Sequence, residues 1–307
     1  MTATEAAAQV LGSRARRDVS IGAMTTYRVG GVAALFVEVE GEDDLRLVAD
    51  AVRASGVDVL VVGKGSNLLV ADRGFDGLAL ALGDAFAAIT IEGTLVRAGG
   101  GVALPVLARR TVAAGLTGLE WAVGVPGSVG GAVRMNAGGH GSDVAATLQR
   151  VRVFDVATGE DGVVPAADLE LGYRASAVTA THVVVWAEFA LEPGDVERGE
   201  AELGDIVRWR RENQPGGQNA GSVFTNPAGE SAGRLVDAAG CKGLRHGSAC
   251  VSEKHANFIQ ADAAGSADDV AALIADVQAR VRRASGITLH PELRMVGFEP
   301  RPEVERS

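Results

Sequence analysis

The chain has 307 residues, 47% hydrophobic and 22% charged, a composition typical of a folded globular protein. Because one domain usually spans about 100–150 residues, two or three domains are expected. The net charge of −10 argues against general affinity for nucleic acid, and no apolar run is long enough to cross a bilayer. The first 17 residues lack the order of a secretory signal, so we expect a frayed or helical leader.

Hydrophobic spacing predicts helices and short strands along the whole chain, without an internal repeat. Helices are predicted at 43–54, 104–114, 197–213, 231–239 and 268–284. Strands are predicted at 57–62, 68–71, 78–82, 88–91, 94–98, 151–155, 163–165, 182–191, 249–252, 258–260 and 293–296. Turn-forming residues at 214–217 are the best candidate for a domain boundary. We expect a frayed tail from residue 300.

The two cysteines, Cys241 and Cys250, are too few for a disulfide framework. Their spacing resembles no common zinc motif, and the five scattered histidines supply no partner cluster. We therefore expect two small, partly buried thiols in a reducing cytoplasm, and no metal site.

The segment 118–141 is the most informative stretch, because it places many glycines among apolar residues. Glycine permits positive φ and a close approach to a ligand, and so many glycines would weaken a helix or strand. The run therefore predicts a loop whose backbone N–H groups face a polar group, as in phosphate-binding nests. A surface linker is the less favoured interpretation, because Leu119, Trp121 and several valines interleave with the glycines.

A second glycine-rich loop, residues 63–67, follows the strand predicted at 57–62. The third glycine of a dinucleotide fingerprint is replaced by Leu68, and the spacing of a P-loop is absent. The segment is thus strand–loop–strand, and its loop either donates to a phosphate or forms a hairpin turn, two readings of about equal weight. Together the two loops predict a pyrophosphate held between them.

Several polar residues beside apolar segments are candidates for chemistry. Arg174 has the fork geometry that clamps a carboxylate or phosphate, although a surface ion pair is the commoner role. Ser222 lacks the second glycine of a nucleophile elbow, so it suits a proton donor better than an acyl nucleophile, with a turn serine as the alternative. His255 and Glu292 flank β-rich segments, where solvated residues are commoner than functional ones.

Seven segments recur in one order: TTYRVGG (25–31), VGKGSNLLV (62–70), the run 118–141, LGYRAS (171–176), AGSVFTNP (220–227), SEKHANFI (252–259) and HPELRMVG (290–297). In this order they resemble the UDP-N-acetylenolpyruvoylglucosamine reductase family, flavoenzymes of peptidoglycan precursor synthesis that serve cell-wall biogenesis, cell shape and cell division. One segment alone is weak, but seven collinear segments are specific.

The resemblance implies an α+β, FAD-binding fold of the vanillyl-alcohol-oxidase/PCMH type with a C-terminal α+β substrate domain. Its parts would be two FAD-binding subdomains at 1–83 and 84–205, a substrate-binding domain at 206–300 and a tail at 301–307. It also implies a cytoplasmic monomer that uses NADPH and bound FAD to reduce UDP-N-acetylglucosamine enolpyruvate to UDP-N-acetylmuramate. Its partners would be these small molecules, with no nucleic acid, membrane or metal.

The resemblance also assigns residues. Arg174, Ser222 and Glu292 match the catalytic positions, with a hydride passing from reduced flavin N5 to the vinyl carbon and a proton coming from Ser222. The FAD contacts it implies are Tyr27, Gly63, Lys64, Gly65, Ser66, Asn67, Leu68, Val125, Pro126, Gly127, Ser128, Gly131, Asn136, Gly138 and His140. Substrate contacts are expected at Asn226, His255 and Arg211.

One departure from the family is informative. A branch of the family carries an insertion after its Tyr-Arg segment, bearing a tyrosine that folds over the substrate, and this chain lacks it. Arg210, Arg211, Lys254 and His255 are therefore candidates for the substrate diphosphate. An oxidase of the same fold would make the C-terminal motifs coincidental. A non-catalytic nucleotide-binding module is disfavoured because all three catalytic candidates are retained.

Overall fold

The computed structural model describes residues 1–299, so the predicted frayed tail lies outside the described residues. The chain divides into two compact units. Unit 1 comprises Met1–Val19, Ala34–Ser66 and Gly77–Gly216, and unit 2 comprises Ser20–Ala33, Asn67–Asp76 and the chain from Gly217 onward. The units therefore part within the turn-rich segment 214–217. The finer division at residues 83 and 205 stays a prediction. Within residues 1–299, no helix has the length and apolar character to span a membrane.

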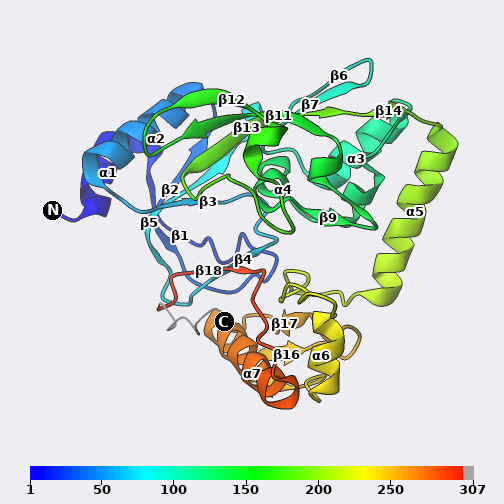
Figure 1. Cartoon of the computed structure of the whole chain (residues 1–307). Helices are drawn as coiled ribbons and strands as arrows, with labels where there is room; N and C mark the ends of the chain where they lie inside the picture. The colour runs from blue at the N-terminus through cyan, green and yellow to red at the C-terminus, as the bar shows by residue number, and fades with distance from the viewer. Residues whose placement is uncertain (300–307) are drawn as a thin grey trace. The chain divides into compact units, whose positions relative to one another are not determined.

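Unit 1 contains a four-stranded sheet covered by two helices (Figure 1). Its strands lie in the order β1 (Arg16–Val19), β2 (Ala33–Val39), β5 (Phe75–Leu82) and β3 (Val59–Val61). The helices are α1 (Ala3–Leu11) and α2 (Glu42–Ser55). The N-terminal leader is thus helical, because Thr2 and Glu5 form a capping box. Acidic residues in the first turn of α2 and Gly56 in the left-handed region at its end set the bounds of that helix.

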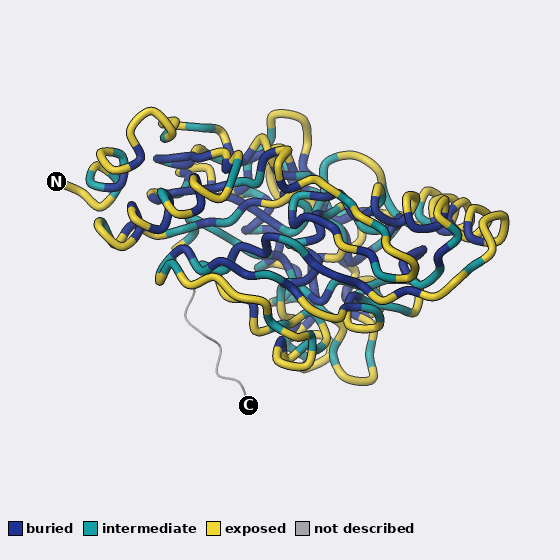
Figure 2. The backbone as a smooth tube through the Cα atoms, turned by 90° about the horizontal axis from the view of Figure 1, so that it is seen from above, coloured by how far each residue is buried: buried dark blue, intermediate teal, exposed yellow. Residues whose placement is uncertain are grey.

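Unit 1 also contains a five-stranded antiparallel sheet. Its order is β12 (Asp161–Pro165), β11 (Leu148–Asp155), β13 (His182–Ala190), β7 (Leu95–Gly99) and β6 (Ile89–Glu92). Helices α3 (Leu104–Ala113), α4 (Val129–Met135) and α5 (Val196–Asn213) accompany it. Two-residue strand pairs are β8 (Leu116–Thr117) with β14 (Glu192–Pro193), and β9 (Gly138–Gly139) with β10 (Ser142–Asp143). The central strands β11, β13 and β7 and the helices α3 and α4 carry the buried core, whereas α5 is mostly exposed (Figure 2).

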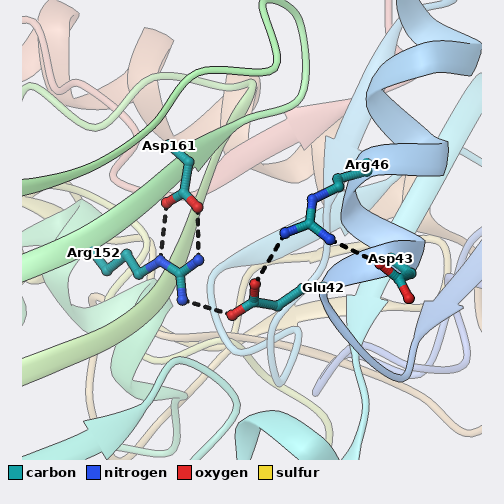
Figure 3. A network of polar contacts seen from close by, with 5 residues as sticks. All are labelled: Glu42, Asp43, Arg46, Arg152 and Asp161. Atoms are coloured by element: carbon teal, nitrogen blue, oxygen red, sulfur yellow. Dashed lines mark hydrogen bonds and ion pairs between the residues drawn. The ribbon is translucent and has the colours of Figure 1, made fainter.

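An ion-pair network joins helix α2 to the five-stranded sheet of unit 1 (Figure 3). Arg152 on β11 donates to both carboxylate oxygens of Asp161, at 2.9 and 2.6 Å, and to Glu42 in the first turn of α2, at 2.7 Å. Arg46 extends the network from Glu42 to Asp43. Hydrogen bonding and charge from Arg152 lower the pKa of both Glu42 and Asp161, so these carboxylates are ionised at neutral pH.

Unit 2 is a smaller α+β body in which α6 (Ala232–Ala238) and α7 (Ala267–Ser285) flank a three-stranded antiparallel sheet (Figure 1). The sheet order is β15 (Arg245–His246), β16 (Ala249–Val251) and β17 (Ile259–Ala261). A separate parallel pair joins β4 (Leu68–Val70) to β18 (Arg294–Val296). Cys241 is buried and Cys250 is half-buried, and both thiols are free.

The structure corrects two readings of the glycine-rich segments. Strands β3 and β4 flank the loop 63–67 but belong to different sheets, so the hairpin interpretation is wrong. The run 118–141 is a loop only in part, because it contains a 3₁₀ segment, Glu120–Gly124, and helix α4. A Cβ on Gly130 of α4 would lie 3.2 Å from the carbonyl oxygen of Gly100, so this glycine serves close packing of the helix.

Candidate active site

The two glycine-rich loops meet within unit 1. A Cβ on Gly63 would lie 2.5 Å from Oγ of Ser128, and a Cβ on Gly127 would lie 3.5 Å from Oγ of Ser66. The loops thus approach at the positions where side chains are absent or small. This is the juxtaposition that the two-loop hypothesis requires.

The second loop is held rigidly by the segment before α3. The Gly127 carbonyl accepts from Leu104 N–H at 2.9 Å, and the Val129 and Gly130 N–H groups donate to the carbonyls of Val102 and Gly100, at 2.8 and 2.9 Å. The Oγ of Ser128 accepts from Gly131 N–H at 3.3 Å and caps α4. These bonds fix the backbone of the loop before any ligand arrives.

The residues predicted to contact FAD occupy three kinds of position. Those exposed are Gly63, Lys64, Pro126, Gly131 and His140; those half-buried are Ser66, Asn67, Val125, Gly127 and Gly138; those buried are Tyr27, Gly65, Leu68, Ser128 and Asn136. All belong to unit 1 except Tyr27, Asn67 and Leu68, which belong to unit 2. The contacts themselves stay predictions.

Tyr27 carries an unused polar group in the core of unit 2. Its side chain is 0% exposed, and its hydroxyl has no hydrogen-bond partner among residues 1–299. Burial raises the pKa of this phenol well above its ordinary value, so it stays a neutral donor. A buried donor without a partner is costly in a folded protein, so the hydroxyl suits a polar group of a bound cofactor.

Arg174 lies in a tight turn between the 3₁₀ segment Ala166–Leu169, which follows β12, and strand β13. Gly172 and Ala175 close the turn with backbone bonds of 3.0 and 3.2 Å, and Arg174 adopts φ 57°. Its guanidinium donates to the Gly138 carbonyl at 3.1 Å and lies 5.2 Å from the ring centroid of Tyr173. Strand β13 begins at His182, so only a short connection follows the Arg174 turn.

Ser222 and Glu292 lie on neighbouring segments of unit 2. Glu292 N–H donates to the Val223 carbonyl at 2.8 Å, and Thr225 N–H donates to the His290 carbonyl at 3.0 Å. The segment after Ser222 therefore runs antiparallel to the segment that carries Glu292. Ser222 is exposed and Glu292 is half-buried, so both side chains are accessible to a ligand.

Asn67 joins the same arrangement from the first glycine-rich loop. Its side-chain amide donates to the Glu292 carbonyl at 3.1 Å, and its own carbonyl accepts from Arg294 N–H at 3.1 Å. The predicted cofactor residue Asn67 and the predicted catalytic residue Glu292 are thus in direct contact within unit 2.

Sequence reasoning did not single out Asn257, which holds the Ser222 segment. This side chain is 4% exposed, accepts from Phe224 N–H at 3.0 Å and donates to the Phe224 carbonyl at 2.8 Å. Its backbone carbonyl accepts from Val223 N–H at 2.8 Å. The available signal was an asparagine between the apolar residues Ala256 and Phe258, a position where a polar residue needs a buried partner.

The predicted substrate contacts are placed differently. Oδ1 of Asn226 accepts from Ala232 N–H at 3.0 Å, next to the start of α6. His255 stacks edgewise on Phe258 with 4.6 Å between centroids, and burial lowers its pKa, which favours the neutral ring. Arg211 is exposed at the end of α5, whereas its neighbour Arg210 is half-buried and donates to Gln214 at 2.7 Å.

Comparison with known proteins points to one family. A family model described as the C-terminal domain of UDP-N-acetylenolpyruvoylglucosamine reductase matches residues 213–296, and a FAD binding domain model matches residues 33–162. The curated UDP-N-acetylenolpyruvoylglucosamine reductase of Synechococcus sp. (strain WH7803) is 42% identical over 296 residues, covering 92% of this chain and 94% of the relative. That of Heliobacterium modesticaldum is 44% identical over 279 residues, covering 89% and 88%.

A solved structure agrees with these matches. The UDP-N-acetylenolpyruvylglucosamine reductase of Thermus caldophilus is similar with a TM-score of 0.81 and 35% identity, covering 92% of this chain and 99% of that chain. The predicted α+β FAD-binding fold is thereby confirmed. The FAD binding domain match spans both glycine-rich loops, the C-terminal match spans Ser222 and Glu292, and Arg174 lies between the two.

Proposed function

The chain belongs to the UDP-N-acetylenolpyruvoylglucosamine reductase family of flavin-dependent oxidoreductases, and we propose that it reduces UDP-N-acetylglucosamine enolpyruvate to UDP-N-acetylmuramate with NADPH. The observation that carries this proposal is the pairing of the Ser222 segment with the Glu292 segment, through the 2.8 Å bond from Glu292 N–H to the Val223 carbonyl. A proton donor and a carboxyl group on neighbouring backbone segments suit the reduction of an enolpyruvyl group.

The residues present fit FAD as the redox cofactor. The two glycine-rich loops meet where side chains are absent, and the buried hydroxyl of Tyr27 is available to a ligand. When bound, FAD would supply the redox chemistry, by which a hydride from NADPH would reach the terminal vinyl carbon of the substrate. Residues 63–67 would hold its pyrophosphate through backbone N–H groups. In 125–131 most N–H groups already donate within the protein, so the second loop would contribute mainly the close approach of its backbone.

Arg174 is proposed to bind the carboxylate of the enolpyruvyl group. As hydride adds to the terminal carbon, charge builds on the neighbouring carbon and spreads into that carboxylate. A guanidinium fork matches a carboxylate in a bidentate geometry and stays charged throughout, so it stabilises this developing charge. Its bond to the Gly138 carbonyl and its contact with Tyr173 orient the fork before substrate binds.

Ser222 is proposed to supply the proton that completes the lactyl ether. An exposed serine hydroxyl is a weak acid, but it is effective when it faces a strongly basic carbon. Glu292, held beside the serine segment, is proposed to donate a hydrogen bond to the substrate carboxylate in its neutral form. Arg210, Arg211, Lys254 and His255 are the candidates for the diphosphate. The lowered pKa of His255 would make its ring a neutral donor there.

An anaerobic half-reaction tests the proposal. The bound flavin is bleached with NADPH, UDP-N-acetylglucosamine enolpyruvate is added, and the oxidised spectrum is followed. We expect rapid return of the yellow form, with the lactyl ether as product. Bleaching without return of the yellow form would indicate another electron acceptor. A folded protein without bound flavin would refute the proposal, including the FAD site at the two glycine-rich loops.

The remaining proposals concern setting and assembly. We propose that the enzyme acts in the cytoplasm, where NADPH and nucleotide sugars are available, and that it works as a monomer with small-molecule substrates. Light scattering of the FAD-bound protein over a range of concentrations tests the assembly. A stable dimer at micromolar concentration would refute the monomer.

A further inference from the structure

Asn136 occupies a special backbone position at the end of α4. It is the C-terminal cap of that helix, with φ 37° and ψ 58°, in the left-handed region where glycine is the usual residue. The side chain is only 3% exposed. Asparagine is one of the few residues that adopt this conformation at low cost, but glycine adopts it more readily. The choice of asparagine therefore points to a task for the side chain.

Both polar atoms of this side chain, Nδ2 and Oδ1, have hydrogen-bond partners in the protein. Nδ2 donates to the Gly172 carbonyl at 2.9 Å and to Oδ2 of Asp143 at 3.2 Å, and Oδ1 accepts from Ala145 N–H at 3.0 Å. Two acceptors on one side and a donor on the other fix the orientation of the amide. With three partners, the amide is engaged by protein groups, which disfavours a direct contact with the cofactor.

The Gly172 carbonyl is the base of the turn that carries Arg174. The same oxygen accepts from Ala175 N–H at 3.2 Å to close that turn. Arg174 itself is in the left-handed region, at φ 57°, so the turn stores conformational strain that surrounding contacts must offset. A buried amide bonded to the closing carbonyl provides such a contact.

A second tie joins the same two segments. Oγ of Ser176 donates to the carbonyl of Arg134 in the last turn of α4, at 2.8 Å, and accepts from Val178 N–H at 3.2 Å. The end of α4 therefore holds the Arg174 turn on both sides. Asn136 bonds Gly172, which precedes Arg174, and the Arg134 carbonyl bonds Ser176, which follows it.

We propose that Asn136 is a positioning residue, which fixes the backbone turn of Arg174 so that the guanidinium is aimed before substrate binds. The inference rests on the proposed function for the role of Arg174, but the anchoring of the turn stands on the bonds alone. The proposed positioning of Arg174 takes the place of the cofactor contact that the sequence predicted for Asn136.

Two variants isolate the side chain. Asn136→Gly keeps the left-handed backbone without strain and removes all three bonds. The exchange Asn136→Asp with Asp143→Asn keeps net charge and shape; Ala145 N–H keeps an acceptor, the pair between positions 136 and 143 keeps one bond, and only the Gly172 carbonyl loses its donor. Thr111→Val is the matched control, since Thr111 is a buried residue of unit 1 whose hydroxyl bonds backbone carbonyls of α3.

Hydrogen–deuterium exchange of the peptide that contains the Gly172 and Ala175 amides is the first readout. We expect both Asn136 variants to speed exchange there by about 10-fold or more, and Thr111→Val to leave it unchanged. This measurement needs no turnover. Unchanged exchange in both variants would overturn the anchoring, whatever the enzyme does.

The half-reactions are the second readout. A misaimed clamp commonly costs about 10- to 100-fold, so we expect substrate-dependent reoxidation to slow by that factor while FAD binding and bleaching by NADPH stay within about 2-fold. Weakened FAD binding with unchanged reoxidation would make Asn136 a cofactor contact and refute the proposal. Absence of reoxidation in the unsubstituted enzyme would instead refute the proposed function. Hydrogen–deuterium exchange would then still show whether Asn136 anchors the Arg174 turn.

Discussion

Asn257→Ala is the substitution whose effect follows most directly from the geometry of unit 2. The amide of Asn257 satisfies both polar groups of the Phe224 backbone, with bonds of 3.0 Å to N–H and 2.8 Å to the carbonyl. Phe224 is 2% exposed, so water does not readily replace the lost amide. A buried backbone group left without a partner costs about 1–3 kcal/mol, and two such groups cost about 2–6 kcal/mol.

The assay is urea unfolding of the FAD-bound protein, followed by far-UV circular dichroism at one fixed FAD concentration. Asn213→Ala is the matched control, because Asn213 is an exposed asparagine whose amide donates to one backbone carbonyl, that of Trp209, at 2.8 Å. An exposed substitution of this kind costs within about 0.5 kcal/mol. If Asn257→Ala costs no more than the control, the reasoning from buried bonds is refuted.

Asn257→Asp adds a second check with a definite sign. The carboxylate still accepts from Phe224 N–H but repels the Phe224 carbonyl, whereas the protonated acid donates to it. Burial and that carbonyl raise the folded pKa of the new acid above its unfolded value near 3.9. Its stabilising contribution is therefore fully present below pH of about 3.9 and is lost as the pH rises through the folded pKa. The stability gap to the unsubstituted protein should narrow on acidification, and a gap that widens would contradict the assigned bonds.

The remaining predictions test the loops, the catalytic candidates and the Figure 3 network. Ser222→Ala should leave bleaching by NADPH nearly intact and slow reoxidation about 10²–10⁴-fold in stopped flow, and equal slowing of both would exclude the proton donor. Arg174→Lys should lose a charged bond of about 1.5–3 kcal/mol, or about 10- to 150-fold in reoxidation, and near-normal turnover would exclude the clamp. Gly63→Ala should push Ser128 Oγ, 2.5 Å from the new Cβ, off its cap bond at a cost of about 1 kcal/mol in thermal unfolding. Adding Ser128→Ala should then cost nothing more, and additive losses would contradict the clash. Arg152→Gln should destabilise the protein at pH 7, and the difference in urea midpoint should shrink below about pH 4 as the two partner carboxylates, whose pKa values Arg152 lowers, become protonated; a constant difference would contradict the network.

Local pattern predicted helices α2, α3, α5, α6 and α7 and most strands, because periodicity reports which face of an element is buried, whereas α4 was expected to be a loop. The spacing of Val270, Leu273, Ile274, Val277 and Val281 placed α7 closely, and all five side chains are buried. Pairing was not predicted, because short apolar strands carry no signal of their partner. Strand β4 pairs with β18, which lies far along the chain, and not with β3 across the loop.

The glycine-rich run shows where composition misleads. So many glycines favoured a loop, because an isolated helix is weakened by each of them. Within the fold, Gly130 of α4 lies where a Cβ would come within 3.2 Å of the Gly100 carbonyl oxygen, and Val129 and Ala132 bury against the core of unit 1. Close packing outweighs the intrinsic preference, and a single sequence does not report the neighbour that makes glycine necessary.

The candidate site also contains residues that the sequence predicts and residues whose role only the structure reveals. Arg174, Ser222 and Glu292 were predicted because their chemistry and motifs are visible in the sequence. The asparagines that hold them differ, because Asn136 and Asn257 act through bonds to backbone groups of Gly172 and Phe224. Almost every residue type offers the same backbone carbonyl and N–H, so the residue types at 172 and 224 do not reveal that an asparagine bonds there. What the sequence does offer is a buried amide without a chemical role. Such an amide must find its partners in the backbone. Beside the Arg174 turn, the proposed consequence is that those partners decide where the guanidinium is aimed.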